Sequence, residues 1–266
     1  MTAVCLAGAT GWTGRAIGAA ILGSEDLTLA SAVGRTSAGR DLGEAWGGEA
    51  NGIVTAGDIA DALDGVDVMV DYTSPGSARR HALTAIDAGV HVVIGTSGLT
   101  AANFEEIDAA ARAARVGVVA AGNFSVTAAM AQAAALLVAP HLPHREIIDY
   151  ASASKQDAPS GTSRELAERL ADVPAAALVV PINATIGEAA ARGATIAGTQ
   201  VHSLRLPSFV VSTEIVFAMP DERLTIRHDA GGTPAPYVAG TLLAIRAVSA
   251  HVGLIRGLDT LLLSRF

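Results

Sequence analysis

Apolar runs of four to seven residues alternate with amphipathic stretches through the first 120 residues of the chain. A short run that is nearly all apolar is typical of a parallel strand buried on both faces, and the stretches between have the period of helices. The predicted strands are Ala3–Ala7, Leu27–Val33, Val66–Asp71, His91–Ile94 and Val116–Ala121. The predicted helices are Gly14–Leu22, Ser77–Ala88 and Ala101–Ala114. The alternation predicts a doubly wound α/β domain.

After residue 125 this regular alternation stops. Helices are predicted at Val126–Leu137, Ser160–Ala171 and Tyr237–Val248, with strand-like runs at Thr199–Leu206, Val210–Ala218 and Arg223–His228. Short turns join the three strand-like runs, so we expect them to pair antiparallel with one another. Residues Glu146–Ser154 alternate poorly and receive no firm assignment. The predicted fold is a Rossmann-like doubly wound nucleotide domain with an inserted mixed α+β substrate domain. The predicted boundaries are 1–124 plus 230–266 for the first domain and 125–229 for the second, substrate-binding and oligomerisation domain.

The first predicted strand runs directly into a glycine-rich turn that opens the first helix. The turn is Gly8-Ala9-Thr10-Gly11-Trp12-Thr13-Gly14, with the spacing G-x-x-G-x-x-G. Glycines at such a turn let backbone N–H groups approach a pyrophosphate at the helix N-terminus. We therefore predict that residues 8 to 13 bind the phosphates of a dinucleotide; the alternative is an ordinary strand–helix turn.

The end of the second predicted strand bears on the choice of cofactor. NAD enzymes usually carry a carboxylate there, which binds the ribose hydroxyls. This chain has Gly34-Arg35-Thr36 instead, so nothing at this point repels a 2′-phosphate and the arginine can bind one. The sequence favours NADPH over NADH, with an ordinary loop arginine as the alternative.

Small and hydroxyl residues follow three further predicted strands. The segments are Asp71-Tyr72-Thr73-Ser74, Gly95-Thr96-Ser97 and Gly122-Asn123-Phe124-Ser125. The carboxyl ends of parallel strands meet at one edge of the sheet, and ligands bind at that edge. We expect Thr73 and its neighbours in these segments to approach the nicotinamide ribose.

Composition excludes several classes of protein. The chain has 266 residues, a formal net charge of −8, one cysteine and 50% hydrophobic residues. This composition excludes disorder, and the absence of a basic stripe argues against nucleic-acid binding. No Cys/His spacing suggests a metal site, and no apolar stretch is long enough to span a membrane. We expect a cytoplasmic protein.

One basic residue differs from all the others. Seventeen of the 18 basic residues are arginines, and Lys155 is the only lysine. A lysine ammonium can donate a proton, whereas a guanidinium stays charged. Lys155 precedes a predicted helix start that contains Ser160, Gly161 and Thr162. An ammonium, hydroxyls and free helix N–H groups together can hold a substrate carboxylate.

At these motifs the chain resembles the dihydrodipicolinate reductase (4-hydroxy-tetrahydrodipicolinate reductase) family over essentially its whole length. The motifs are Asp71-Tyr72-Thr73, Ile94-Gly95-Thr96-Ser97-Gly98, Asn123-Phe124-Ser125, the run from Lys155 to Thr162, Val201–Leu206 and Leu224–Asp229. The resemblance implies a homotetrameric enzyme of lysine biosynthesis that transfers hydride from NADH or NADPH to a cyclic, conjugated imine dicarboxylate. It also implies a cofactor site made of Gly8, Ala9, Thr10, Gly11, Trp12, Thr13, Gly34, Arg35, Gly95, Thr96, Ser97, Ala121, Gly122, Asn123 and Phe124. By the same resemblance Gly161 and Thr162 hold a substrate carboxylate, and Lys155 is catalytic or polarises the substrate.

One segment departs from the family. The family carries His-His-x-His-Lys before the D-A-P-S-G-T motif, with the first histidine as proton donor and the second binding substrate. This chain has Ala151-Ser152-Ala153-Ser154-Lys155. Lys155 remains a possible proton donor, Ser152 can hydrogen-bond a substrate, and Tyr150 is expected on the opposite face of its strand. His202 is expected to be half-buried, and His228 to form a surface pair with Asp229.

Three functions remain open on the sequence. The first is a divergent reductase of another small carboxylated cyclic imine or conjugated acid. The second is an authentic 4-hydroxy-tetrahydrodipicolinate reductase that uses Lys155 without the histidine. The third is a non-redox or inactive nucleotide-binding homologue. Retention of the only lysine argues against the third, because a structural lysine could have become arginine as elsewhere.

Overall fold

The computed structural model describes residues 1–263 and divides into two compact units. The first contains residues 1–126 and the described residues from 234 on, and the second contains residues 127–233. Each unit has its own sheet and its own core. The predicted class, an α/β chain with a Rossmann-like parallel sheet and a mixed second sheet, is confirmed.

The first unit is built on a seven-stranded sheet in which every pair of neighbours is parallel. Its strands are β1 (Thr2–Ala7), β2 (Leu27–Val33), β3 (Thr55–Ala56), β4 (Val68–Asp71), β5 (His91–Ile94), β6 (Gly117–Ala120) and β12 (Gly253–Arg256). The order is β12-β6-β5-β4-β1-β2-β3, so the direction of travel reverses between β1 and β4. Open α/β sheets bind ligands at such a reversal, beyond the carboxyl ends of the strands.

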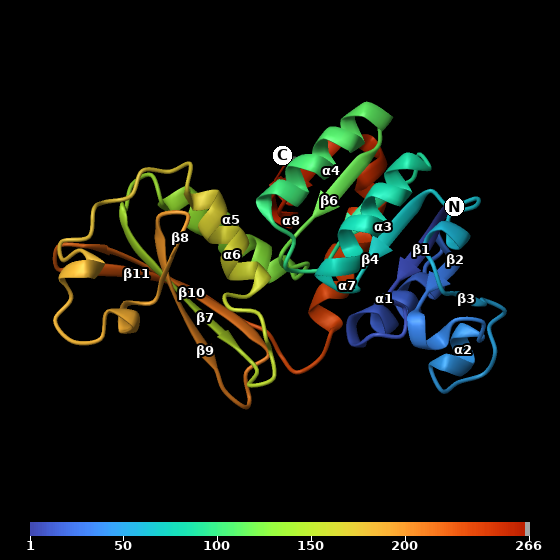
Figure 1. The fold of residues 1–266 in the computed structure, drawn as a ribbon, viewed down its shortest axis with the longest axis horizontal. Coiled ribbons are helices and arrows are strands. Elements are labelled where there is room, and N and C mark those ends of the chain that lie inside the picture. Colours follow the sequence, from blue (N-terminus) through green and yellow to red (C-terminus); the bar gives the residue numbers. More distant parts are fainter. Residues whose placement is uncertain (264–266) are drawn as a thin grey trace. The chain divides into compact units, whose positions relative to one another are not determined.

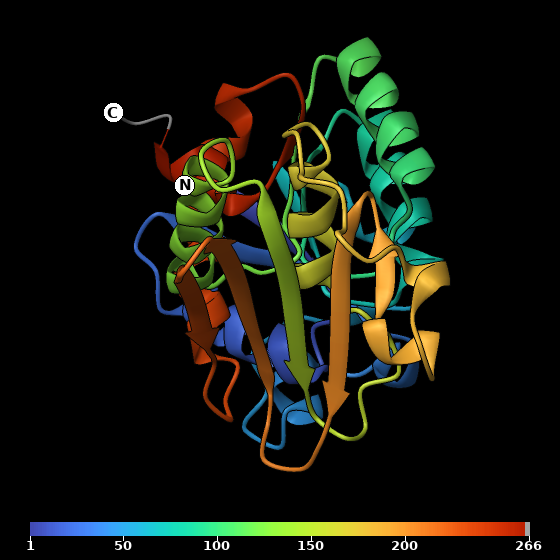
Figure 2. The same ribbon diagram turned by 90° about the vertical axis from the view of Figure 1, so that its left-hand side faces the viewer.

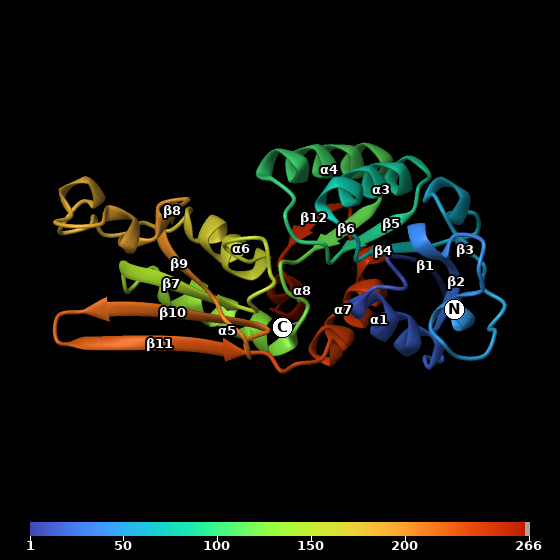
Figure 3. The same ribbon diagram turned by 60° about the horizontal axis from the view of Figure 1, so that its bottom comes forward.

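Helices cover both faces of this sheet (Figures 1 and 3). The helices of the first unit are α1 (Trp12–Leu22), α2 (Leu42–Ala45), α3 (Pro75–Asp87), α4 (Ala101–Ala114), α7 (Ala235–Ala247) and α8 (Leu258–Leu263). On one face α3 packs beside α4, and on the other α1 packs beside α7. Strands β4 and β6 are buried at every residue, which is why they appear as unbroken apolar runs in the sequence. Strands β3 and β12 were missed, because one is two residues long and the other is only partly buried.

The second unit has a five-stranded mixed sheet in the order β11-β10-β7-β9-β8 (Figure 2). Its strands are β7 (His144–Ala151), β8 (Ala194–Ile196), β9 (Thr199–Arg205), β10 (Val211–Met219) and β11 (Glu222–Asp229). Helices α5 (Val126–Val138) and α6 (Gly161–Leu170) supply apolar side chains to the core on one face of the sheet. Short 3₁₀ helices complete the chain at Arg35–Ser37, Ala60–Ala62, Ile182–Ala184, Ala189–Arg192 and Val248–Ala250.

The expected pairing of the three late strands is only partly right. β10 pairs antiparallel with β11, but β9 pairs parallel with β7, and β7 lies between β9 and β10. The reason is that the segment with poor alternation forms the central strand. Its inward face carries Arg145 and Asp149 beside Ile147 and Ala151, so burial alternates although hydropathy does not. The buried guanidinium of Arg145 is compensated by hydrogen bonds that it donates to the carbonyls of Leu170 and Val173.

No helix among the described residues combines the length and the apolar character that a membrane span requires.

Candidate cofactor and substrate sites

A cavity of about 490 Å³ lies at the carboxyl edge of the first unit's sheet. The residues that follow β1, β2, β3 and β4 line it, together with the first turns of α3. Seven of the residues predicted to bind a cofactor are on this lining: Gly8, Thr10, Gly11, Gly34, Arg35, Thr36 and Thr73. These residues are as many as 65 positions apart, between Gly8 and Thr73, and the strand order brings them together.

The glycine-rich turn is sterically required to lack side chains at two positions. Gly8 has a φ of +82°, and a Cβ there would lie 2.2 Å from the carbonyl oxygen of Tyr72. A Cβ on Gly14 would lie 2.1 Å from the carbonyl oxygen of Gly8. Helix α1 starts immediately after Gly11 and has no acidic residue in its first turn, so its unpaired N–H groups and its dipole favour an anion. This turn fits the phosphates of a dinucleotide.

Three residues predicted in the same motif do not line the cavity. Ala9 is fully buried, and its carbonyl accepts a hydrogen bond from Nε1 of Trp46 at 3.0 Å. Trp12 is half exposed and contacts the ring of Tyr237 edge-on. Thr13 lies in the first turn of α1. A role for these three residues therefore depends on their backbone groups or on a ligand that extends beyond the cavity.

The cavity lining carries a carboxylate that the sequence analysis did not predict. Arg35 is exposed at the end of β2, as expected, but a carboxylate also reaches the lining from the loop after β3. This is Asp58, whose two oxygens lie 3.1 and 2.9 Å from Nη1 of Arg80. The Ala60 amide and the Arg80 guanidinium lower the pKa of Asp58. The carboxylate is therefore ionised and already paired with a cation.

The segments after β4, β5 and β6 lie in order along one edge, because these strands are neighbours. A Cβ on Gly95 would lie 2.3 Å from the ring of Tyr72, so the second segment packs directly on the first. Phe124 is buried and meets the same ring edge-on. The Tyr72 hydroxyl lies 2.6 Å from Oγ1 of Thr241, and burial raises the pKa of Tyr72, which keeps the phenol protonated. Gly95, Thr96, Ser97, Ala121, Gly122, Asn123 and Phe124 are outside the cavity lining.

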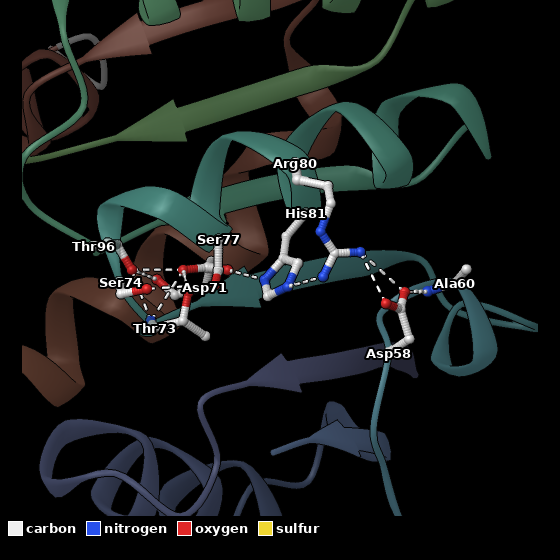
Figure 4. Close-up of polar contacts among 9 residues, drawn as sticks. All are labelled: Asp58, Ala60, Asp71, Thr73, Ser74, Ser77, Arg80, His81 and Thr96. Carbon is white, nitrogen blue, oxygen red and sulfur yellow. Dashed lines mark hydrogen bonds and ion pairs between the residues drawn. The ribbon is translucent and has the colours of Figure 1, made fainter. Parts of the chain in front are cut away.

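A buried polar network that sequence reasoning missed lies beside the cavity (Figure 4). Asp71, the last residue of β4, has no exposed surface, and its Oδ1 accepts hydrogen bonds from Oγ1 of Thr73 at 2.8 Å and Oγ1 of Thr96 at 2.5 Å. Its Oδ2 lies 2.7 Å from Nδ1 of His81 in α3. Nε2 of His81 in turn lies 3.3 Å from Nη2 of Arg80. The available signal was an acid closing an otherwise apolar strand, with a histidine ten residues later.

In the second unit, the predicted substrate motif is organised around a buried carboxylate. Asp149 in β7 is fully buried, and its Oδ2 accepts from the Ser160 amide at 2.9 Å, Oγ of Ser203 at 3.1 Å and Nη2 of Arg205 at 2.8 Å. Its Oδ1 accepts from Oγ of Ser163 at 3.1 Å. Burial raises the pKa of Asp149, but the hydrogen bonds and the Arg205 charge outweigh burial, and the net pKa is lowered. The start of α6 is thereby tied to the sheet.

Lys155 lies in the loop between β7 and α6. Its Nζ is 2.8 Å from Oδ1 of Asp157, and its side chain is 24% exposed, so the ammonium is partly accessible. Nη2 of Arg205 donates to the Asp157 carbonyl at 2.6 Å, which links this loop to Asp149. Ser152 is near the other end of the loop, with its Oγ 3.3 Å from Oγ of Ser154. Lys155 and Ser152 are therefore the polar side chains that this loop presents from the predicted set.

The N-terminus of α6 carries the other three predicted substrate residues. Ser160 is the N-cap, and its Oγ accepts from the Ser163 amide at 3.4 Å. Since its own amide is bonded to Asp149, both polar groups of Ser160 already have partners inside the unit. Gly161 and Thr162 form the first turn, where backbone N–H groups point out of a helix and can bind an anion.

The position at which the sequence analysis expects a departure from the family is buried and apolar. Ala151 ends β7 with no exposed surface, on the same face as Asp149. Tyr150 lies on the opposite face, as expected, and its hydroxyl donates to Glu214 at 3.1 Å. Burial and Glu214 raise the pKa of Tyr150. Neither residue offers an acid that titrates near neutral pH at this end of β7.

Two histidines elsewhere in the second unit have other partners. His202 is half-buried, as expected, with Nε2 2.7 Å from Oε2 of Glu146. The expectation of a surface pair at His228 is wrong, because this side chain is buried with Nε2 3.1 Å from Oγ1 of Thr127. Burial lowers the pKa of His228, so it is neutral at neutral pH.

Comparison with known proteins gives consistent matches along the chain. The family profile described as dihydrodipicolinate reductase, N-terminus, matches residues 2–124, and the profile described as its C-terminus matches residues 123–262. The 4-hydroxy-tetrahydrodipicolinate reductase of Moorella thermoacetica is 37% identical over 264 residues, which is 97% of each chain. That of Beutenbergia cavernae is 38% identical over 240 residues, 89% of this chain and 96% of the other. The dipicolinate-bound dihydrodipicolinate reductase of Paenisporosarcina sp. TG-14 has a TM-score of 0.77 at 27% identity, covering 98% of this chain and 99% of the other.

Proposed function

This chain belongs to the dihydrodipicolinate reductase family of NAD(P)H-dependent oxidoreductases, and from that premise we propose that it is a divergent member. Its substrate is a small carboxylated cyclic imine, or a related acid with a conjugated C=N or C=C bond. The family acts in lysine and diaminopimelate biosynthesis. The observation that carries the proposal is the buried methyl group of Ala151 at the place where the family has its proton-donating histidine.

The first unit would hold the cofactor, which supplies a hydride when bound. The glycine turn and the start of α1 would bind its pyrophosphate, since two Cβ atoms there would collide with backbone and the helix end favours an anion. Arg35 would bind the 2′-phosphate of NADPH, because the end of β2 carries no carboxylate to repel it. Thr73 and the residues after β5 and β6 would lie toward the nicotinamide ribose.

The second unit would hold the substrate. Gly161 and Thr162 would bind a substrate carboxylate through backbone N–H groups at the start of α6. Lys155 would face the reacting C=N bond as an ammonium, stabilise negative charge on the substrate and supply a proton where the substrate does not already carry one. Asp157, 2.8 Å from the ammonium, would hold it in place.

The loss of the histidine favours a changed substrate for a physical reason. Proton delivery by a positioned acid is worth about 10²- to 10⁴-fold in rate. An imine that is already protonated in solution needs no such acid, so a pocket with Ala151 and Ser152 can reduce it without this loss. A methyl group and a hydroxyl in place of two imidazoles would also make a substrate site at this loop roomier and less cationic.

A second candidate function is the family's own reaction, reduction in lysine biosynthesis with Lys155 as the only proton donor. What favours it is identity of 37% over 97% of the chain with the 4-hydroxy-tetrahydrodipicolinate reductase of Moorella thermoacetica. The two candidates predict different rates on the same substrate and can be separated by one assay.

The test is NADPH oxidation with freshly generated family substrate, comparing the wild type with the double variant Ala151→His/Ser152→His. If the wild type does not oxidise NADPH with this substrate and the double variant does, the result supports a site that has changed its substrate. A panel of other carboxylated imines then identifies that substrate. Turnover by the wild type at ordinary enzyme rates, about 10 per second, contradicts divergence and assigns the family's own reaction. NADPH binding by both proteins is the control for folding.

For assembly we propose a cytoplasmic homotetramer formed through the sheets of the second unit. The face of this sheet opposite α5 and α6 is lined by Glu146, Ile148, Gln200, His202, Val216 and Ala218, and it contains a hollow of about 520 Å³. A mixed apolar and charged sheet face suits association with identical copies. Light scattering of the purified protein measures the mass directly, and a monomer contradicts the proposal.

A further inference from the structure

The network around Asp71 has no role in the proposal above, although it borders the predicted cofactor cavity. Asp71 is completely buried and shares its two oxygens between different partners. One oxygen binds the hydroxyls of Thr73 and Thr96, and the other binds His81. A buried carboxylate is costly unless each oxygen is hydrogen-bonded, so all three partners are needed to keep it there.

The contacts indicate the tautomer of His81. A guanidinium can only donate hydrogen bonds, so Nε2 of His81, 3.3 Å from Nη2 of Arg80, must accept. The ring proton is then on Nδ1, which donates to Oδ2 of Asp71 at 2.7 Å. Arg80 is itself held by both oxygens of Asp58. The Nδ1–H tautomer of His81 is therefore the one that fits between Arg80 and Asp71.

The other oxygen of Asp71 connects two loops. The Thr73 hydroxyl and amide both donate to Oδ1, at 2.8 and 3.1 Å, and the Thr96 hydroxyl donates to the same atom. The Thr73 amide also lies 2.8 Å from Oγ1 of Thr96. Asp71 thus holds the loop after β4 and the loop after β5 in one arrangement, and Thr73 lines the cavity.

We propose that Asp71 and His81 are positioning residues for the nicotinamide half of the cofactor. His81 holds the Asp71 carboxylate through its Nδ1–H group, and Asp71 fixes Thr73 and Thr96 at the strand ends where the nicotinamide ribose would bind. Neither residue touches the reacting atoms. The inference rests on the proposed cofactor site but not on the identity of the substrate, so binding alone can test it.

The variants are His81→Leu, which removes the donor to Asp71, and His81→Asn, whose amide N–H can replace Nδ1–H. Arg80→Leu is the matched control, because it removes the guanidinium that lines the cavity beside His81 and leaves the His81–Asp71 hydrogen bond. The readout is the ratio of the Kd for NADPH to the Kd for 2′,5′-ADP, measured calorimetrically. A change that weakens binding of the adenosine half raises both Kd values and cancels in this ratio. A general loss of folded protein cancels in the same way.

We expect His81→Leu to raise the ratio about tenfold, as for one hydrogen bond to a charged group. We expect His81→Asn to restore it and Arg80→Leu to leave it unchanged. An unchanged ratio in His81→Leu, or an equal rise in His81→Asn, overturns the inference. If His81→Leu does not fold, Thr96→Val is measured in the same way, and an unchanged ratio there overturns it too. A wild type that fails to bind NADPH contradicts instead the proposed function.

Discussion

Replacing Asp149 by asparagine is expected to destabilise the second unit strongly. The side chain keeps its shape but loses its charge, and Arg205, only 17% exposed, loses its counter-ion. One of the two carboxylate oxygens also becomes an NH₂ group, which cannot accept from the donors that face it, either Ser163 on one side or Ser160, Ser203 and Arg205 on the other. Breaking a buried ion pair from one side costs about 3–5 kcal/mol. That is a large part of the usual total of about 5–15 kcal/mol.

The assay has to report on the second unit. Both tryptophans, Trp12 and Trp46, belong to the first unit, so their fluorescence does not follow unfolding of the second. Amide hydrogen exchange in β7 and α6 measures the opening free energy of these elements directly. Asp229→Asn is the matched control, because its ion pair with Arg227 is exposed and is worth at most about 1 kcal/mol.

The pH dependence gives a second check on the same reasoning. The folded pKa of Asp149 is lowered, so its contribution to stability is present above the unfolded value of about 3.9 and is lost as pH falls through the folded pKa. The difference between the wild type and Asp149→Asn should therefore be full at pH 7 and shrink below about pH 4. A loss under about 1 kcal/mol at pH 7, or a difference independent of pH, refutes the assignment of Asp149 as a compensated buried charge.

Further predictions concern the two cations of the proposed sites. Lys155→Ala should abolish turnover while the Kd for NADPH stays near the wild-type value, because Lys155 lies in the second unit; an active variant removes Lys155 from the chemistry. Arg35→Ala should weaken NADPH binding about 10- to 100-fold, because hydrogen bonds to a charged group are lost. It should weaken NADH binding far less. Titration of both cofactors measures this, and equal losses show that Arg35 does not bind the 2′-phosphate.

The parts of the fold that were predictable are those where burial and hydropathy agree. In β4 and β6 every residue is buried and apolar or small, with Asp71 the one exception, so the strands are visible as runs. The glycine turn was recognisable because two of its positions must lack a Cβ. The central strand β7 was not recognisable, because half of its inward face is Arg145 and Asp149. Partners for these two charges come from residues up to 56 positions away.

The candidate-site residues also fall into two groups, those that a local motif indicates and those that only the fold brings together. Local motifs indicated Gly8, Arg35 and Lys155, whose backbone conformation or chemistry is visible from their neighbours. The Asp58–Arg80 pair at the cavity and the Asp71–His81 hydrogen bond were not visible. Each joins residues that no short motif connects.

The pattern of residues was sufficient to predict the alternation of strands and helices, the glycine-rich turn after the first strand, and the family. The completed fold was needed to show that β7 separates β9 from β10, that Asp71 and Asp149 are buried, and which donors hold them. This difference comes from the range of the interactions. Backbone conformation and helix or strand periodicity are set within a few residues, whereas a buried charge is permitted only by partners that the completed fold brings to it.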